Sequence, residues 1–152
     1  MFNVVQAYDR IEDVRMLFAE YTTMLGVDLS FQNYDEEFAS LPGKYAPPDG
    51  RLFLAEVDGM PVGCIALRRF ESNRGEMKRL FVRPEYRGQG LGCALVEAVI
   101  AAARECGYEA LILDTQTRLE NSVALYRKLG FRETEPYYAN PYIGVVYFTL
   151  DL

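Results

Sequence analysis

The sequence contains no histidine, and this absence limits the chemistry that the protein can perform. Histidine is the commonest general base, so proton transfer must fall to carboxylates, tyrosines, lysines, cysteines or water. Only Cys64, Cys93 and Cys106 carry thiols, and no two of them form a CxxC pair. The usual Cys/His ligand set for zinc is therefore missing, and we expect no metal requirement. Each cysteine lies in an apolar run, which favours buried, reduced thiols.

Long apolar segments and a surplus of positive charge are also missing. No stretch approaches the ~18 apolar residues of a membrane span, and the first 16 residues lack the basic and apolar regions of a signal peptide. The formal net charge is −6 at pH 7, which argues against a general nucleic-acid binder. We therefore expect a cytoplasmic protein without a nucleic-acid or membrane partner.

The composition that remains is that of an ordinary globular domain. Half of the 152 residues are hydrophobic, which is enough to bury a core. No repeat, low-complexity tract or linker divides the chain. We therefore expect residues 1–152 to form a single domain.

Apolar periodicity predicts alternating strands and helices in the order β-α-α-β-β-β-α-β-α-β-β. Between Ile11 and Leu25 the apolar residues follow the 3.6-residue period of a helix, with Asp9 as its cap and Gly26 as its end. Asp58-Gly59 separates two apolar runs, which is a strong hairpin signal. We expect an α/β (mixed α+β) fold with a twisted, mostly antiparallel sheet of about six to seven strands and about four flanking helices. The predicted strands are 3–8, two runs within 51–70, 76–82, 109–115, 131–133 and 143–152, and the predicted helices are 9–26, 33–41, 91–106 and 120–130.

The most distinctive pattern of the chain precedes the helix predicted over 91–106. Gly88, Gly90 and Gly92 alternate at the start of this helix, directly after Arg87. Glycines allow the free N–H groups of a helix N-terminus to turn toward a ligand, and arginine adds donors that suit phosphate oxygens. The pattern predicts a pyrophosphate site, and a glycine-rich turn without a ligand is the alternative.

Two common nucleotide sites fit this pattern less well. A P-loop ends in Gly-Lys-Ser/Thr, whereas "GLGCAL" contains neither lysine nor a hydroxyl residue. A Rossmann site needs a third glycine where this chain has Cys93 or Leu95, although Asp114 ends the next strand at a suitable distance. Too little chain follows Gly92 for repeated βαβ units, so a Rossmann-type nucleotide binder is only a minor alternative.

The segment Arg87-Gly88-Gln89-Gly90-Leu91-Gly92 resembles the Q/R-x-x-G-x-G/A motif of the GNAT superfamily of acyl-CoA-dependent N-acyltransferases. "NSVALYRKLGF", residues 121–131, is similar to a later helix and turn of that family. The resemblance extends over roughly residues 50–135. It implies a central pair of parallel strands that splay apart, with the pantetheine arm of acetyl-CoA in the gap.

The resemblance also implies which residues bind acetyl-CoA. Main-chain groups of the fourth strand and Asn121 would bind the pantetheine arm, and the amides of the glycine segment would hold the pyrophosphate. Lys128 or Arg127 would assist with the phosphates or simply face solvent. The implied binding residues are Leu80, Phe81, Val82, Arg87, Gly88, Gln89, Gly90, Leu91, Gly92, Cys93, Asn121, Tyr126 and Lys128.

Two side chains would take part in the chemistry that the resemblance implies. Glu76 lies where many family members supply a general base, often through water, and its alternative role is an ion pair with Lys78 or Arg74. Tyr126 would protonate the leaving thiolate, and its alternative role is to pack into the core. A main-chain N–H near Val82 would stabilise the oxygen of the thioester carbonyl.

The sequence does not identify the acceptor. Three segments fall where the family builds its acceptor pocket, and their tyrosines and acids could equally cover the core. The expected function is acetyl transfer from acetyl-CoA to a primary amine of a small molecule or peptide, by direct attack in a ternary complex. An acyl-CoA-binding sensor of the same fold is the alternative, and the apolar strand 145–150 could pair at a sheet edge to form a homodimer. The candidate pocket residues are Tyr34, Tyr45, Tyr137, Tyr138 and Tyr142, with Asp35, Glu36 or Glu37 attracting a cation.

Overall fold

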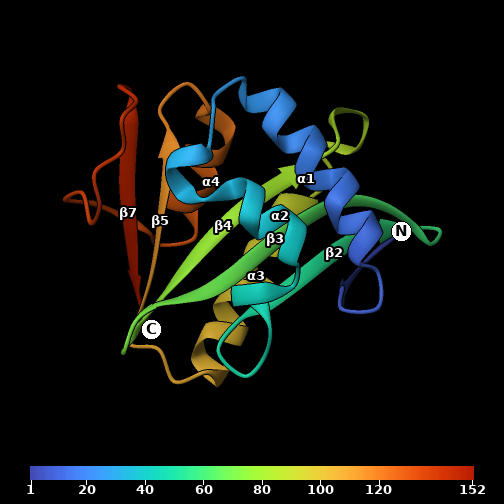
Figure 1. Cartoon of the computed structure of the whole chain (residues 1–152), viewed down its shortest axis with the longest axis horizontal. Helices are drawn as coiled ribbons and strands as arrows, with labels where there is room; N and C mark the ends of the chain where they lie inside the picture. Colours follow the sequence, from blue (N-terminus) through green and yellow to red (C-terminus); the bar gives the residue numbers. More distant parts are fainter.

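A seven-stranded mixed sheet forms the centre of the computed structural model, which describes residues 1–152 (Figure 1). The strand order is β1-β2-β3-β4-β5-β7-β6, and every neighbouring pair is antiparallel except β4 and β5. This confirms the predicted fold class, and it excludes a Rossmann fold, which needs repeated parallel strands. The strands are β1 (Phe2–Gln6), β2 (Arg51–Val57), β3 (Met60–Glu71), β4 (Arg74–Val82), β5 (Ala110–Gln116), β6 (Arg132–Thr134) and β7 (Val145–Asp151).

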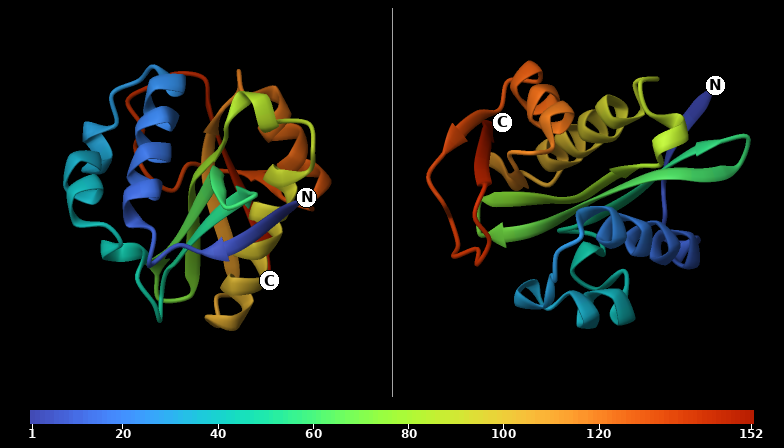
Figure 2. Two further views of the ribbon diagram at one scale, coloured as in Figure 1. Left: turned by 90° about the vertical axis from the view of Figure 1, so that its right-hand side faces the viewer. Right: turned by 90° about the horizontal axis from the view of Figure 1, so that it is seen from above.

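Helices cover both faces of the sheet. Figure 2 shows α1 (Ile11–Leu25) and α2 (Tyr34–Ser40) on one face, and α3 (Leu91–Glu105) and α4 (Glu120–Lys128) on the other. The number and order of the helices agree with the prediction. Short 3₁₀ helices are η1 (Ser30–Gln32), η2 (Gly43–Tyr45) and η3 (Pro84–Tyr86).

The start of α1 differs from the predicted start. Arg10 precedes the helix, and no side chain caps it, so the predicted Asp9 cap is wrong. The Arg10 amide donates to the carbonyl of Ala7 (2.9 Å), which places Asp9 inside a turn rather than at the helix end. The Arg10 guanidinium then binds Asp13 on the first turn of the helix (2.9 Å).

Two hydrophobic cores lie on opposite faces of the sheet. Phe18 of α1 is fully buried in one core and Val99 of α3 in the other. Side chains of a strand alternate between the two faces, and β3 accordingly sends Cys64 toward the α1 side and Ile65 toward the α3 side. Burial of each large apolar side chain contributes about 1.5–3 kcal/mol relative to exposure, so the amphipathic helices fix both layers.

The parallel pair β4 and β5 is joined at one end only. Their pairing runs from Arg74–Ala110 to Glu76–Ile112, and β4 continues beyond it to Val82. The register of β4 against β3 shows a bulge, in which two residues of β4 face one of β3. Within this bulge Arg79 has a φ of +64°. Bulges bend a strand and increase its twist, so the bulge turns β4 away from β5 and confirms the splayed pair.

The last strand, β7, lies inside the sheet. It pairs with β5 along one side and with β6 along the other. Residues 145–150 therefore do not form the free edge strand that was predicted, because β6 pairs with Tyr147, Phe148 and Thr149 on that side. The edge strands of the sheet are β1 and β6.

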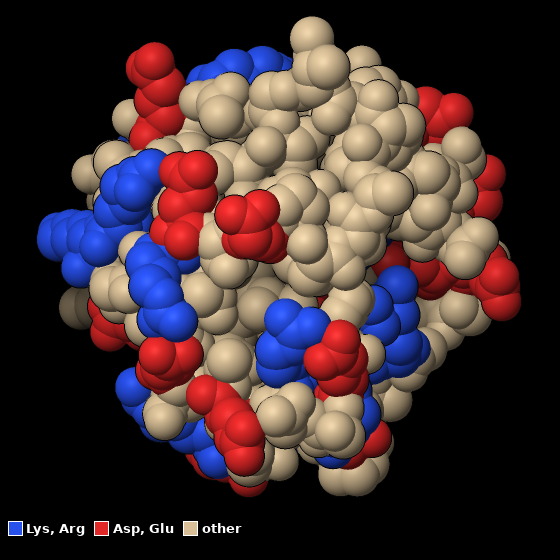
Figure 3. All heavy atoms as spheres, turned by 90° about the vertical axis from the view of Figure 1, so that its left-hand side faces the viewer, with Lys and Arg blue, Asp and Glu red and all other residues tan.

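Charges of both signs share the surface of the molecule. In Figure 3 basic side chains lie beside acidic ones over one part of the face, and a broad area is uncharged. No helix of the structure is both long and apolar enough to cross a membrane.

Candidate active site at the splayed strands

A groove of about 690 Å³ opens where β4 leaves β5. It runs between the end of β4, the start of α3 and the start of α4. Three of the predicted binding residues do not line this groove, namely Gln89, Tyr126 and Lys128. The predicted residues that do line it are Leu80, Phe81, Val82, Arg87, Gly88, Gly90, Leu91, Gly92, Cys93 and Asn121.

The start of α3 presents free amides to this groove. The first helical hydrogen bond joins the Ala94 amide to the Gly90 carbonyl (3.1 Å), and no side chain caps the helix. Gly88 and Gly90 have φ values of +79° and +88°, and a Cβ at either position would meet no atom within 4 Å. Glycine is therefore required by the backbone conformation, and the space in front of it is open. Uncapped amides and the helix dipole together make a site for an anion.

Arg87 lies at the rim of the groove. Its Nε donates to the Val82 carbonyl (2.8 Å), and its guanidinium lies 6.0 Å from the centre of the Phe81 ring. These contacts hold the side chain while its remaining donors stay exposed. Gln89 and Lys128 are exposed outside the groove lining.

A second, smaller cavity of about 70 Å³ adjoins the groove. Leu80, Leu119 and Ser122 line both spaces, so they form the boundary between them. Tyr126 lines the small cavity and not the groove. A molecule in the groove and a second molecule in the cavity would therefore meet at this boundary, beside Tyr126.

Tyr126 packs into the core and also lines the small cavity, and its role as a proton donor stays a prediction. Its ring packs against Phe131 and Phe148, with centroid distances of 5.7 Å and 6.1 Å, and only 5% of the residue is exposed. Burial raises the pKa of Tyr126, and the neighbouring Tyr21 and Asp114 raise it further. The phenol therefore keeps its proton at neutral pH, the state that a proton donor needs.

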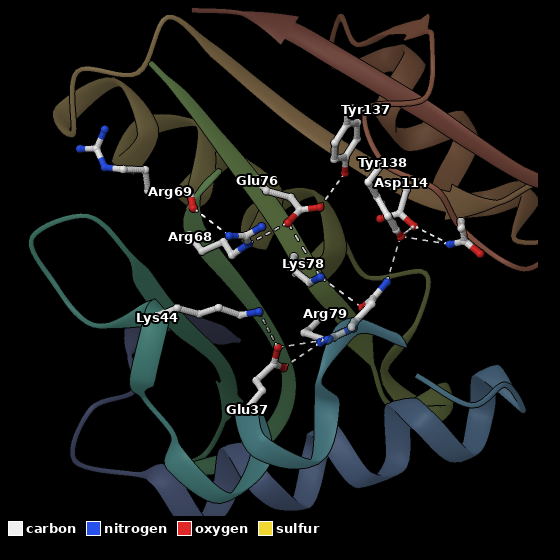
Figure 4. Close-up of polar contacts among 12 residues, drawn as sticks. Glu37, Lys44, Arg68, Arg69, Glu76, Lys78, Arg79, Asp114, Tyr137 and Tyr138 are labelled. Carbon is white, nitrogen blue, oxygen red and sulfur yellow. Dashed lines mark hydrogen bonds and ion pairs between the residues drawn. The ribbon is translucent and has the colours of Figure 1, made fainter. Parts of the chain in front are cut away.

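Glu76 is buried in an ion-pair network next to the cavity (Figure 4). Its Oε1 accepts a hydrogen bond from Arg68 (2.9 Å), and its Oε2 accepts one from the Tyr137 hydroxyl (2.7 Å). The ammonium of Lys78 lies 3.8 Å from Oε1. Glu76 lines neither the groove nor the cavity, so both of its oxygens serve to hold neighbouring side chains.

Lys78 and Arg79 are the cations that line the cavity. The side chain of Lys78 is 8% exposed, and its Nζ donates to Gln32 Oε1 (3.1 Å). Burial lowers the pKa of Lys78 to about 8, although the charge of Glu76 opposes this shift. The guanidinium of Arg79 donates to both oxygens of Glu37 (2.9 and 3.1 Å) and to Gln32 Oε1 (2.9 Å), so each of its three nitrogens has a partner.

Asp114 is the carboxylate that lines the cavity, and the sequence analysis considered it only for the Rossmann alternative. Its Oδ2 accepts hydrogen bonds from the Tyr138 hydroxyl (2.7 Å) and from the Asn140 amide (3.4 Å). Burial raises the pKa of Asp114, and the hydrogen bond from Tyr138 and the charge of Lys78 only partly offset the effect. A single acid at the end of the apolar strand "ALILD" was the available signal.

Most of the tyrosines and acids expected around an acceptor lie elsewhere. Tyr142 lines the cavity, whereas Tyr45 is fully buried in the core beneath α1. Glu37 turns inward to Arg79. Burial alone would raise the pKa of Glu37, but hydrogen bonds from Arg79 and its charge lower it. The remaining candidates, Tyr34, Asp35, Glu36, Tyr137 and Tyr138, do not line the cavity.

Comparison with known proteins gives one consistent family. A family model described as "Acetyltransferase (GNAT) family" matches residues 11–131. An uncharacterized N-acetyltransferase from Schizosaccharomyces pombe is 44% identical over 144 residues, which cover 93% of this chain and 88% of that protein.

Solved structures of the same family have this fold. A GNAT family acetyltransferase from Staphylococcus aureus superposes with a TM-score of 0.82 at 20% identity, over 99% of both chains. A GNAT family acetyltransferase from Elizabethkingia anophelis with acetyl-CoA bound gives a TM-score of 0.59 at 27% identity, over 68% of this chain and 77% of that one.

Proposed function

Since this chain belongs to the GNAT acetyltransferase family, we propose that it is an enzyme that transfers the acetyl group of acetyl-CoA to a primary amine. The observation that supports this most directly is the groove at the uncapped, glycine-bordered start of α3. It suits a pyrophosphate, and it shares a wall with a cavity that can hold an acceptor. The cytoplasm and a homodimer remain the expected location and assembly.

Acetyl-CoA would lie along the groove. The amides of Leu91, Gly92 and Cys93, together with Arg87, would hold the pyrophosphate, and the pantetheine arm would follow the main chain of residues 80–82 and Asn121. Arg118, which the sequence analysis missed, also lines the groove. Its side chain donates to Gln116 and to the Leu25 carbonyl, which fixes it at the groove wall.

The acetyl group would pass directly to the acceptor at the boundary of the two spaces. The neutral amine nitrogen attacks the thioester carbonyl carbon, a C–N bond forms, and the C–S bond breaks to release the CoA thiolate. Tyr126 donates the proton that the thiolate takes up. The nitrogen loses a proton to a carboxylate of the protein, so the products are an N-acetylated amine and CoA. No metal ion is needed, since the thioester is already activated.

Two carboxylates are candidates for the general base that takes the proton of the amine. Glu76 stays a prediction, and its position outside the cavity lining requires a relay through water or through Lys78 at 3.8 Å. Asp114 lines the cavity itself, and a raised carboxylate pKa suits a base that works near neutrality. Turnover of Glu76→Gln and Asp114→Asn, measured across pH, separates the two roles. The variant of the true base loses the acidic limb of the pH profile, because the rise of activity with pH reports deprotonation of the base.

The size of the cavity favours a small acceptor. Its volume is about 70 Å³, and the Tyr142 hydroxyl closes one side by accepting from the Asp28 amide (3.0 Å) and donating to the Asp28 carbonyl (3.1 Å). The Phe31 ring meets Tyr142 edge-on, with centroids 5.8 Å apart. A peptide could enter only by its terminal amine or a side chain.

Thermal-shift titration with acetyl-CoA, CoA and NAD tests whether the protein binds the cofactor. A ligand at ~100 times its dissociation constant adds about 2.7 kcal/mol to the stability of the folded state. We expect this shift with both CoA species, a clear loss of it in Arg87→Glu, and none with NAD. Acetylation of amines by the same preparation, with Tyr126→Phe slowed, would support transfer. Binding of CoA without turnover of any amine would favour the acyl-CoA sensor, and no response to CoA would overturn the proposal.

A further inference from the structure

Lys78 is a buried cation with too few partners. Its side chain is 8% exposed and lines the small cavity. An ammonium has three N–H donors, and only the one to Gln32 Oε1 (3.1 Å) is a hydrogen bond to the protein. The nearest carboxylate oxygen, Oε1 of Glu76, is 3.8 Å away and already accepts from Arg68. Donors of Lys78 are therefore free to bind a ligand.

Asp114 is a carboxylate in the same cavity that has no cation partner. Its contacts are the neutral Tyr138 hydroxyl and the neutral Asn140 amide. No lysine or arginine nitrogen lies within 4.0 Å of it, although four basic residues, Lys44, Arg68, Lys78 and Arg79, belong to the surrounding network. Buried charges are normally paired, but the charges of Lys78 and Arg79 act on Asp114 only from beyond contact distance.

The neutral side chains of Gln32 and Tyr138 connect these two opposite charges by hydrogen bonds, and Figure 4 labels Lys78, Tyr138 and Asp114. Gln32 accepts from Lys78 with Oε1 (3.1 Å) and donates from Nε2 to the Tyr138 hydroxyl (3.0 Å). Tyr138 in turn donates to Asp114 (2.7 Å). Gln32 and Tyr138 thus fill the direct path between the ammonium and the carboxylate. The cavity has a positive group on β4 and a negative group on β5, separated by a bridge of two side chains.

We infer that the acceptor of the proposed acetyl transfer is a small free amino acid or a close analogue, with its ammonium group at Asp114 and its carboxylate at Lys78. This inference rests on the proposed function and narrows its substrate class. A zwitterion gives the Asp114 carboxylate a cation and the free donors of Lys78 an acceptor, whereas an amine without a carboxylate leaves those donors without a hydrogen bond. The orientation follows from Asp114, whose charge also acts on Tyr126. The amine therefore lies at the end where the thioester is cleaved, and the product keeps its carboxylate at Lys78.

Apolar and aromatic residues form the rest of the cavity, among them Leu29, Phe31 and Tyr142. An apolar amino-acid side chain fits these walls better than a third charge does. Arg79 does not compete for the carboxylate, because Glu37 occupies its Nε and Nη2, and its Nη1 donates to Gln32 Oε1 (2.9 Å).

Matched acceptors test the inference. Leucine, methionine and phenylalanine are compared with their amides and with the amines that lack the carboxyl group, and the acetylated product is measured by mass spectrometry. We expect kcat/KM for the free amino acids to exceed that of the matched amines by about tenfold or more, which corresponds to ~1.4 kcal/mol. In Lys78→Met this ratio should fall close to one, through a higher KM for the amino acids.

Lys44→Met is the control variant. Lys44 belongs to the same charged network, through Glu37 (3.3 Å), but its side chain is 38% exposed and does not line the cavity. The preference for the carboxylate should survive this change. Lys78→Arg restores the positive charge and should recover part of the preference.

The possible results are distinct. Acetylation of amines and amino acids at similar kcat/KM would overturn the inference and leave the proposed transferase intact. If no acceptor is acetylated, the proposed function fails, and amino-acid binding to the CoA-loaded protein decides the inference separately. A thermal shift with leucine or phenylalanine that disappears in Lys78→Met supports the zwitterion site, and no shift overturns it.

Discussion

Some buried positions of this protein hold charged side chains, although packing alone would favour apolar ones. Lys78 shows this most clearly, because burial lowers its pKa from 10.5 to about 8. Each pKa unit corresponds to about 1.4 kcal/mol, so the buried ammonium weakens the fold by about 3 kcal/mol at neutral pH. A group retained at such a cost is better explained by binding than by stability.

Replacement of Lys78 by methionine should stabilise the protein at pH 7, by about 1–3 kcal/mol. The folded chain releases the Lys78 proton near pH 8 and the unfolded chain near 10.5. Below pH 8 the full penalty is present, and between these values the unfolded state binds more protons, so wild-type stability rises with pH. The advantage of Lys78→Met should therefore shrink as the pH rises from 8 to 10.5.

Urea unfolding of both proteins at pH 7 and pH 10 measures this difference. Lys44→Met, at a side chain that is 38% exposed, should show no comparable gain. An equal or lower stability of Lys78→Met at pH 7 would contradict the assigned penalty.

Helix α3 shows how one element combines a structural and a binding requirement. Gly90 precedes the helix with a φ of +88°, and Gly107 follows it with a φ of +81°. A Cβ at either position meets no atom within 4 Å, so alanine is disfavoured at both by backbone strain alone. Only Gly90 lines the groove.

Gly90→Ala and Gly107→Ala should each destabilise the protein by about 1–2 kcal/mol, because a left-handed backbone disfavours a Cβ. Gly90→Ala alone should weaken the binding of acetyl-CoA, since its Cβ enters the space in front of the helix amides. Calorimetric titration with acetyl-CoA and urea unfolding give the two quantities. Similar losses of affinity in both variants would show that the effect is global destabilisation and not a local one.

At the scale of the whole molecule, the groove and the cavity are separate spaces, and this separation determines the kinetic mechanism that we expect. Leu80, Leu119 and Ser122 are shared by the two spaces, so both substrates can be present together and meet there. Initial rates at varied acetyl-CoA and acceptor should therefore give intersecting double-reciprocal lines, as direct transfer requires.

Parallel lines, with an acetylated enzyme found by mass spectrometry, would indicate a covalent intermediate instead. Cys93 is the thiol that lines the groove. Its hydrogen bond to Glu97 (2.8 Å) is the main cause of its raised pKa, which disfavours the reactive thiolate. The intersecting pattern should persist in Cys93→Ser.

Local patterns in the sequence were enough to predict most of the secondary structure of this protein and the place of the groove. Apolar periodicity placed the helices and strands in their observed order, because the period of an element depends only on residues close along the chain. The turn at Asp58-Gly59 was equally predictable, and both residues have the positive φ values that this turn needs. The glycine segment after Arg87 likewise indicated the groove at α3.

The tertiary structure alone decided the interior of the candidate site. The bulge at Arg79, the partners of Glu76 and the interior position of β7 depend on how distant strands pair. Gln32, Lys78, Asp114 and Tyr138 come together from η1, β4, β5 and the segment before β7. The pKa and pairing of a buried charge depend on such distant neighbours, and no local pattern records them. The sequence therefore indicated the groove proposed for acetyl-CoA, and only the packed sheet showed which charged side chains line the adjoining cavity.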